Sequence, residues 1–368
     1  MKYYIIAGEA SGDLHASNLV KALKQKDASA NFRGWGGDML KAEGVELVEH
    51  YRNTSFMGFV EVIKNLRTIF RFLAECKRDI LNYKPDALIL VDYPGFNLRI
   101  AEFAKQQNLK VFYYISPQIW AWKEGRVKKI KRDVDKMFVI LPFEKDFYKK
   151  HNYEVEFVGH PLLDAIKSFS NTKNFVEENN LSDKKIVALL PGSRAQEIKK
   201  MLEPMKEVAQ HFPDYQFVIA GVNSVEKNIY EEELRGTELK VVFNQTYQLL
   251  QNSSAAIVTS GTATLETALF GVPQMVCYKG NSISYFIGKQ LVKVIYISLV
   301  NLIMDKEVVR ELIQQNMNVE NMKTELKKLL SDENYRSLIL NEYKLLQNSL
   351  GGSGASEKTA EAIFKSIQ

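Results

Sequence analysis

Short apolar runs alternate with amphipathic stretches along most of the chain. Residues 2–7 form the first apolar run, and Leu14, Leu19, Val20 and Leu23 then recur at helical spacing. Runs of this length predict buried strands, and a recurrence every three or four residues predicts a helix packed against them. Such alternation favours parallel sheets with right-handed crossovers. Further strands are predicted at residues 87–92, 111–115, 136–141, 155–158, 186–190, 216–220, 240–243, 255–258 and 274–277, with a strand-to-turn junction at 32–37.

The length of the chain favours two domains. At 368 residues it exceeds the size at which a single core usually stops growing, and a polar stretch at 168–185 divides it. We therefore predict an α/β protein with two doubly wound domains, residues 1–168 and 169–350. Residues 351–368 open on a glycine-rich break and end in a helix, 357–367, that crosses back to the first domain. Other C-terminal helices are predicted at 308–313, 322–330 and 335–346.

The composition is that of a soluble globular protein. Apolar residues make up 46% of the chain and charged residues 25%. The N-terminal apolar run is too short for a signal peptide, and no run approaches the roughly 18 apolar residues of a membrane-spanning helix. Cys76 and Cys277 are isolated, and the five histidines show no metal-ligand spacing. We therefore expect a cytosolic protein without a structural metal.

The net charge of +5 is mild but unevenly distributed. Residues 123–136 hold seven basic residues against three acids. Two interpretations fit this basic run: a solvated helix face, or a surface that binds a phosphorylated substrate or anionic lipid.

A turn at Ser260-Gly-Thr262 has the chemistry of a phosphate site. It follows a predicted buried strand and precedes a helical pattern, so backbone N–H groups and the positive end of a helix dipole meet there. Gly261 allows close approach, and the two hydroxyls add donors. Glu266, one helical turn further, would suit a pair of ribose hydroxyls. The alternative is an ordinary strand–helix turn with a capping Ser or Thr.

A second turn in the same half, Gly192-Ser193-Arg194, adds a fixed cation. Together the two turns would form a positive cradle for a nucleotide. Arg and helix N-termini can stabilise a leaving diphosphate without a metal ion. The lack of an Asp-x-Asp pair in this half of the chain fits a metal-free enzyme.

The first half carries acids where its predicted strands end. Glu9 and Asp13 follow the first strand, and Asp92 ends another, at the edge where ligands bind in open α/β sheets. A carboxylate there could take the proton of a hydroxyl acceptor. Asp13 could equally serve as a helix N-terminal acid. No G-x-G-x-x-G follows any predicted strand, which argues against a dehydrogenase.

Two further segments have open interpretations. Residues 56–73 place large apolar side chains at helical spacing opposite Lys64, Arg67 and Arg71. Such a helix could cover the core or lie in a membrane interface. Trp120 and Trp122, in a Pro-containing loop, could form a binding wall or pack in the core.

A series of motifs in this chain resembles the lipid-A-disaccharide synthase family, glycosyltransferases with two Rossmann-like domains facing a cleft (the GT-B architecture). Each motif alone is weak, but they run in family order over nearly the whole chain. They are Ala7-Gly-Glu-Ala-Ser-Gly-Asp-Leu-His15, Met57-Gly-Phe-Val-Glu-Val62, Asp92-Tyr-Pro-Gly-Phe-Asn97, Ile119-Trp-Ala-Trp122, Pro142-Phe-Glu144, Phe157-Val-Gly-His-Pro-Leu162, Leu190-Pro-Gly-Ser-Arg194, Ser260-Gly-Thr-Ala-Thr-Leu-Glu266 and Asn301-Leu-Ile303.

The resemblance implies an inverting transfer of 2,3-diacylglucosamine from UDP to the 6-hydroxyl of 2,3-diacylglucosamine 1-phosphate. The products would be UDP and the β-1,6 disaccharide 1-phosphate of lipid A biosynthesis, a component of the Gram-negative outer membrane. We then expect no cofactor and no metal. The expected partners are the two lipid substrates, an anionic membrane surface and a second copy in a homodimer, and no nucleic acid. The location would be cytoplasmic, peripheral on the inner face of the inner membrane.

The resemblance also assigns residues by position. Asp92 matches the acid most often considered the base, and Glu9 matches an acid essential in the family. His15 lies in the first motif, where helix capping or packing fits as well as catalysis. The UDP site would comprise Gly192, Ser193, Arg194, Ser260, Gly261, Thr262, Glu266 and Asn301. The acyl-chain or membrane surface would comprise Phe56, Met57, Phe59, Val62, Ile63, Leu66, Arg67, Phe70 and Arg71.

Two alternatives stay open at this point. One is another UDP-sugar enzyme of the same architecture, such as an epimerase or a peptidoglycan-precursor glycosyltransferase, which would need no apolar-basic helix at 56–73. The other is a non-catalytic nucleotide-sugar or lipid-binding protein, which would show no turnover. The chain departs from the family at Val300 and Arg310, where Pro is common. These departures concern loop stiffness more than chemistry.

Overall fold

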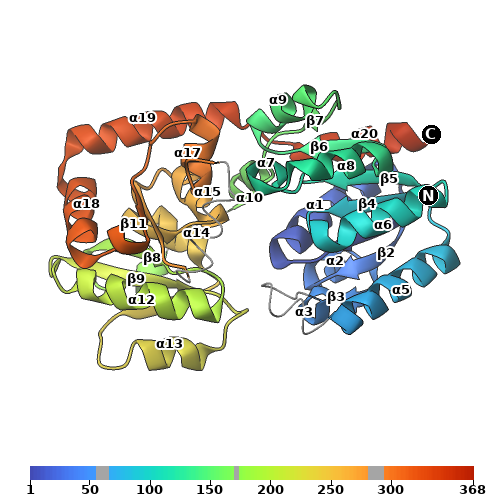
Figure 1. Ribbon diagram of the computed structural model, residues 1–368. Coiled ribbons are helices and arrows are strands. Elements are labelled where there is room, and N and C mark those ends of the chain that lie inside the picture. The colour runs from blue at the N-terminus through green and yellow to red at the C-terminus, as the bar shows by residue number, and fades with distance from the viewer. Residues whose placement is uncertain (55–65, 170–173, 281–293) are drawn as a thin grey trace. The chain divides into compact units, whose positions relative to one another are not determined.

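The computed structural model describes residues 1–54, 66–169, 174–280 and 294–368 and divides the chain into two compact units (Figure 1). The first unit contains Met1–Asp164 and Leu350–Gln368, and the second contains Ala165–Ser349. The chain passes from one unit to the other inside α10 (Leu162–Ser168). Each unit is a parallel sheet covered by helices, so the expected α/β class with two doubly wound domains is confirmed.

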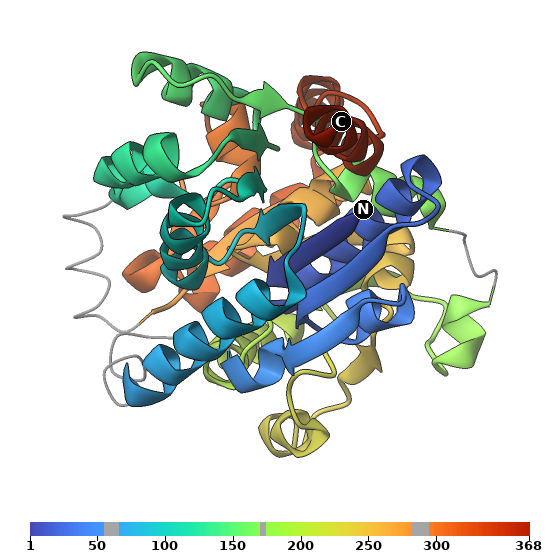
Figure 2. The ribbon, with the colours of Figure 1, turned by 90° about the vertical axis from the view of Figure 1, so that its right-hand side faces the viewer.

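The sheet of the first unit has the strand order β3-β2-β1-β4-β5-β6-β7, and all its pairings are parallel (Figure 2, blue to green strands). The order reverses between β1 and β4, where Ala7 pairs with Val91. In sheets of this kind, ligands bind beyond the carboxyl ends of the strands at that reversal. The strands are β1 (Lys2–Ala7), β2 (Asn31–Gly36), β3 (Glu46–His50), β4 (Ala87–Val91), β5 (Lys110–Tyr114), β6 (Lys136–Val139) and β7 (Glu156–Phe157).

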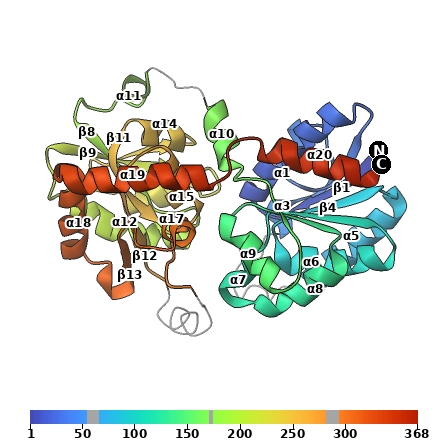
Figure 3. The same ribbon diagram turned by 90° about the horizontal axis from the view of Figure 1, so that it is seen from above.

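Helices cover both faces of this sheet. α1 (Ala10–Lys26) and α20 (Ala355–Ile367) pack on one face, and α5 (Leu66–Tyr83), α6 (Pro94–Gln106) and α8 (Val127–Asp133) pack on the other (Figure 3). The strands are apolar throughout because both of their faces are buried. Shorter elements are α2 (Asp38–Ala42), α3 (Tyr51–Thr54), α7 (Ile119–Trp122), η1 (Glu124–Arg126) and α9 (Pro142–Lys150).

The last helix is fastened to the first unit at its N-terminus. Both carboxylate oxygens of Asp164 accept backbone N–H bonds, from Gly354 at 2.5 Å and from Ala355 at 3.0 Å. These bonds satisfy donors that a helix N-terminus leaves open. α20 then lies along α1 and contacts β5 (Figure 3).

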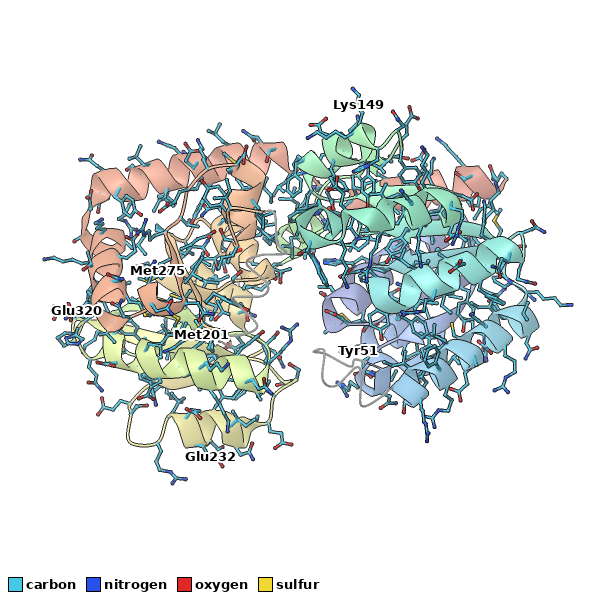
Figure 4. The ribbon with its side chains drawn as sticks, in the orientation of Figure 1. Tyr51, Lys149, Met201, Glu232, Met275 and Glu320 are labelled. Atoms are coloured by element: carbon cyan, nitrogen blue, oxygen red, sulfur yellow. The ribbon has the colours of Figure 1, made fainter. Side chains whose placement is uncertain are left out.

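The second unit repeats the pattern, with the order β10-β9-β8-β11-β12-β13 and a reversal between β8 and β11. Met201 of α12 and Met275 of β12 are buried in its core, whereas Glu232 and Glu320 lie on the surface (Figure 4). The strands are β8 (Lys185–Leu190), β9 (Tyr215–Gly221), β10 (Lys240–Phe243), β11 (Ser253–Thr259), β12 (Gln274–Tyr278) and β13 (Glu311–Ile313). The helices are α11 (Phe175–Glu178), α12 (Ala195–Ala209), α13 (Lys227–Glu233), α14 (Thr246–Gln251), α15 (Thr262–Leu269), α17 (Leu299–Met304), η2 (Gln314–Asn316), α18 (Val319–Ser331) and α19 (Glu333–Ser349).

Three features differ from the sequence analysis. The helix expected at 308–313 is wrong, because Glu311–Ile313 forms β13, paired with β12 at the edge of the sheet. The strand β3 lacks a clear alternation and was not predicted. The polar stretch 168–185 is not a simple linker, since it contains α11 and buries Phe175 in the core of the second unit.

Candidate active site

Two acids lie at the reversal point of the first sheet. Glu9 follows β1 and Asp92 follows β4, and these strands are direct neighbours. Burial raises the pKa of the Asp92 carboxyl to about 7, and the charge of Glu9 adds to the rise, while the backbone N–H of Tyr93 opposes it. A carboxyl with a pKa near neutrality can both take and return a proton under physiological conditions.

The turn that carries Asp92 is strained and held in place. Asp92 and Tyr93 have φ angles of 45° and 50°, in the left-handed region that such residues seldom adopt. The buried amide of Asn97 donates to the carbonyls of Val91 (3.2 Å) and Asp92 (2.7 Å). Tyr113 Oη donates to the same Asp92 carbonyl at 2.5 Å. Strain of this kind persists where the surroundings fix the backbone, and it is frequent at functional sites.

The loops after β1 and β4 are in close contact. A Cβ atom at Gly8 would lie 2.2 Å from Cγ of Tyr93, so only glycine fits there. The residue next to Glu9 therefore has to be small for the two acid-bearing loops to approach one another.

Asp13 does not belong to this acid pair. Its buried carboxylate accepts N–H bonds from Gly37 (2.7 Å), Met39 (3.0 Å) and Leu40 (3.3 Å). Asp13 therefore holds the start of α2, and its structural interpretation is the one that the geometry supports.

His15 is also an interior residue. It is 8% exposed, and burial lowers its pKa to about 4, so its imidazole is neutral at physiological pH. The pKa of His160, lowered to about 3, reflects burial and the proximity of His15. The two rings lie in the core of the first unit, which fits the packing interpretation of His15.

The two tryptophans have different environments. Trp120 packs edge-on against Phe143 and donates from Nε1 to Glu144 Oε1 at 3.3 Å. Trp122 is 50% exposed and carries Lys123 Nζ 3.9 Å from its ring centre. Trp120 therefore belongs to the packed interior, whereas Trp122 remains available to a ligand.

The two glycine-containing turns of the second unit meet at the reversal of its sheet. Gly192, Ser193 and Arg194 follow β8, and the Ser260–Thr262 turn follows β11, the neighbouring strand. Gly192 has a φ of 111°, which favours glycine. The carboxyl edge of this sheet thus gathers two helix N-termini and one guanidinium, a combination that favours an anion.

Glu197 closes the first of these turns, which the sequence analysis did not anticipate. Its carboxylate accepts from Arg194 Nη1 at 2.7 Å and from the Ser193 backbone N–H at 3.3 Å. The Arg194 side chain is 54% exposed. A diphosphate that binds Arg194 would therefore compete with Glu197. The pairing i, i+3 along α12 is the sequence signal that could have indicated it.

The second turn exposes donors and keeps an acid nearby. Gly261 and Thr262 are exposed at the N-terminus of α15, while Ser260 Oγ donates to the Ile297 carbonyl at 2.7 Å. Glu266 accepts from Tyr247 Oη at 3.2 Å, and burial raises the pKa of its carboxyl. Glu266 retains acceptor capacity for ribose hydroxyls, because this bond uses one of its two oxygens.

Asn301 occupies a different position from the one expected. It is fully buried, and its Nδ2 donates to Val309 O (2.8 Å) and to Glu311 Oε1 (2.9 Å). Its Oδ1 accepts from the backbone N–H groups of Val308 (2.8 Å) and Val309 (3.0 Å). The amide is satisfied within the protein, so this geometry does not support the expected direct contact with a nucleotide. Asn301 instead orders the segment between α17 and β13.

Gln314 is a polar residue at this edge that the sequence analysis missed. It follows β13 with a φ of 53°, it is 7% exposed, and its Nε2 has no partner among the described residues. Unsatisfied buried donors are uncommon and call for a functional or structural reason. No spacing rule points to it, because the expected helix at 308–313 placed the residue in the wrong element.

Comparisons with known proteins decide the family. The family model described as lipid-A-disaccharide synthetase matches residues 3–363. A lipid-A-disaccharide synthase from Syntrophus aciditrophicus is 40% identical over 364 residues, covering 97% of this chain and 95% of that protein. One from Coxiella burnetii is 37% identical over 371 residues, covering 99% of this chain and 98% of its own. The chain belongs to the lipid-A-disaccharide synthase family.

The lipid-A-disaccharide synthase assignment confirms the family resemblance and gives the function as lipid A disaccharide synthesis, a glycosyl transfer. Solved structures share the fold at low identity. A UDP-GlcNAc 2-epimerase from Neisseria meningitidis bound to UDP-GlcNAc has a TM-score of 0.71 at 14% identity, covering 99% of this chain and all of its own. The glycotransferase of kitacinnamycin has a TM-score of 0.67 at 13% identity. These likenesses confirm the GT-B type of fold.

Only part of the expected lipid-contact surface of this lipid-A-disaccharide synthase falls within the described residues. α5 begins at Leu66, and its Leu73 faces the core. Phe70 is 62% exposed, the Arg71 side chain is 64% exposed, and Arg67 is exposed on the same helix. Phe56, Met57, Phe59, Val62 and Ile63 lie outside the described residues.

Two searches of the described residues gave negative findings. No helix among them has the length and apolar content to cross a bilayer. Within the same residues, no three or more His, Cys, Asp or Glu side chains gather as a metal site would require.

Proposed function

We propose that this chain transfers 2,3-diacylglucosamine from its UDP carrier to the 6-hydroxyl of 2,3-diacylglucosamine 1-phosphate, with inversion at the anomeric carbon. The C1–O bond to UDP breaks, a bond forms between C1 and the acceptor oxygen, and the acceptor's proton leaves to a base. The products are UDP and the β-1,6-linked disaccharide 1-phosphate. The family assignment supports the reaction, and the acids at the edge of the first sheet support its chemistry.

The observation that carries the proposal is the pairing of Asp92 with Glu9 at the reversal of the first sheet. Asp92 is the proposed general base, because its raised pKa of about 7 makes it basic enough to accept the hydroxyl proton. Glu9 contributes a negative charge that raises the basicity of Asp92. A fixed backbone turn holds Asp92 in one position, which reduces the entropy lost in reaching the reactive geometry.

The second unit is proposed to hold the UDP leaving group. The diphosphate would bind at the N-termini of α12 and α15, with Arg194, Ser260 and Thr262 as side-chain donors. Glu266 would accept from ribose hydroxyls. These groups can carry the charge that develops on the leaving oxygen, so the proposal includes independence of added metal ions and of any cofactor.

We also propose peripheral binding to the inner face of the inner membrane through the outer face of α5. Both substrates carry acyl chains, and an exposed Phe70 beside Arg67 and Arg71 suits the boundary between acyl chains and anionic headgroups. Phe70→Ser should reduce co-sedimentation with anionic vesicles. Leu338→Ser, at a residue 65% exposed on α19, is the matched control. Equal binding by all three proteins would argue against this surface.

Mass spectrometry of the reaction products tests the proposed function directly. Purified protein is incubated with UDP-diacylglucosamine and diacylglucosamine 1-phosphate, with and without a chelator, and a disaccharide 1-phosphate is expected in both. Asp92→Asn should lower turnover by roughly 100-fold or more while UDP affinity stays near normal, as expected for a lost base. Unchanged turnover would exclude Asp92 as the base, and dependence on metal would exclude the cofactor-free mechanism.

A further inference from the structure

The basic run at 123–136 divides into two parts with different partners. In its second part the cations are paired: Arg132 contacts Asp133 (2.6 Å) and Glu102 (2.7 Å), and Lys136 contacts Glu156 (3.5 Å). Those pairs are typical of a solvated surface. The first part, around η1, differs from them.

Lys123 and Arg126 have no carboxylate partner among the described residues. The nearby acid of the run, Glu124, contacts His151 Nε2 at 3.1 Å. Lys123 lies over the exposed ring of Trp122. Arg126 is only partly exposed, so part of its charge is removed from water without compensation from an acid.

A third cation, Arg99 of α6, lies close to these two. Burial lowers the pKa of Arg126, Tyr113 opposes that change, and the charge of Arg99 adds to the lowering. Burial and then the charge of Arg126 lower the pKa of Lys123. Arg99 reaches back to the first turn of α6, where its Nη1 donates to the Gly95 carbonyl. Three cations thus repel one another at one place, and a bound anion would relieve that repulsion.

This cation cluster (Arg99, Lys123 and Arg126) borders the proposed base. Arg126 is near enough to Tyr113 for the two side chains to interact electrostatically, and Tyr113 Oη donates to the Asp92 carbonyl. Arg99 is on the helix that starts directly after the Asp92 turn. An acceptor whose 6-hydroxyl reaches Asp92 carries its phosphate on C1, across the same sugar ring. The positive charge therefore lies within one sugar residue of the base.

We propose that Arg99, Lys123 and Arg126 bind the phosphate monoester of the acceptor sugar and so orient its 6-hydroxyl toward Asp92. This inference rests on the proposed function. Arg supplies a planar pair of donors that match phosphate oxygens, and Lys adds a mobile point charge. The same chemistry would suit an anionic lipid headgroup, so the test has to distinguish the two sources of phosphate.

The test is a cycle of two proteins and two acceptors, diacylglucosamine 1-phosphate and diacylglucosamine. For Arg126→Ala we expect kcat/KM to fall roughly 10-fold to 100-fold with the phosphorylated acceptor, mainly through KM, and by less than about 3-fold with the dephosphorylated one. Arg126→Lys should recover part of the loss. Lys129→Ala, at an exposed position of the same run, is the matched control and should behave as wild type with both acceptors.

Each result bears on the inference. Equal losses with both acceptors would overturn the phosphate site but leave the proposed function intact. A loss of binding to anionic vesicles, with acceptor discrimination unchanged, would assign the cation cluster to headgroups and overturn the inference. If wild-type protein formed no disaccharide from either acceptor, the proposed function would fail, and this site with it. Arg126→Gln, which retains most of the side-chain volume, repeats the cycle if the alanine variant unfolds.

Discussion

Replacing Glu9 with glutamine should shift the pH dependence of the reaction toward acid. Asp92 acts as a base only when it is deprotonated, so kcat/KM should fall about tenfold per pH unit below the pKa of this carboxyl. With a pKa of about 7, half of the Asp92 carboxyls are ionised at pH 7 and roughly a tenth at pH 6. An ordinary Asp, with a pKa of 3.8, would give a flat profile over this range.

The size of the effect follows from the causes of the raised pKa. The difference between 3.8 and about 7 corresponds to about 4 kcal/mol in favour of the protonated form. Burial is the larger cause and survives the substitution, whereas the repulsion from Glu9 is removed. Each 1.4 kcal/mol of repulsion removed lowers the pKa by about one and raises the ionised fraction at pH 6 from roughly a tenth to about half. The pKa should therefore fall but stay above 3.8.

The assay is kcat/KM for UDP release between pH 5.5 and 9, measured for wild type and Glu9→Gln. The phosphate of the acceptor also titrates near pH 6, so the difference between the two proteins is the informative quantity. Glu154→Gln, an exposed acid of the same unit, serves as the control and should leave the midpoint unchanged. Identical midpoints for wild type and Glu9→Gln would refute the coupling of the two acids. A flat wild-type profile would refute the role of Asp92.

Three further predictions concern other parts of the molecule. Glu197→Gln should tighten UDP binding several-fold in calorimetry, because it frees Arg194 from its ion pair; weaker binding would show that Glu197 positions the arginine instead. Asn301→Ala should lower the free energy of unfolding by about 2–4 kcal/mol in urea titrations, since it leaves several buried backbone groups unpaired. UDP affinity of the folded variant should change less than about 10-fold if Asn301 is structural. His15 and His160 have folded-state pKa values of about 4 and 3 against 6.5, so the unfolded chain binds protons more readily; stability is then fully present above pH 6.5 and lost progressively as the pH falls toward 3, and His15→Gln should show a shallower loss between pH 7 and 5.

The strand and helix pattern was predictable because both sheets are buried on two faces. Buried parallel strands are continuous apolar runs, and the face of α12 that the sequence predicts to point inward is the buried one. The edge strands were harder to predict. β3 has partly exposed residues at four of its five positions, and β13 is three residues long, so neither shows a period that a sequence pattern can detect.

The position of the candidate sites was predictable, but the partners of their side chains were not. Strand ends place Asp92 and Ser260 at the reversal points, because the carboxyl edge of a parallel sheet collects the turns. Whether an acid or amide at such an edge faces a ligand depends on tertiary hydrogen bonds. Asp13 and Asn301 have the same chemistry as ligand-binding residues, yet the protein uses both to hold its own backbone.

The attachment of α20 to Asp164 has a consequence for synthesis. A ribosome releases the chain from its N-terminus, so the seven strands of the first unit emerge long before the helix that covers one face of their sheet. The N-terminal unit therefore waits for the final residues of the chain before it is complete, while the second unit, which is contiguous, can finish first. A premature stop near residue 350 would accordingly damage the part of the protein that was translated earliest.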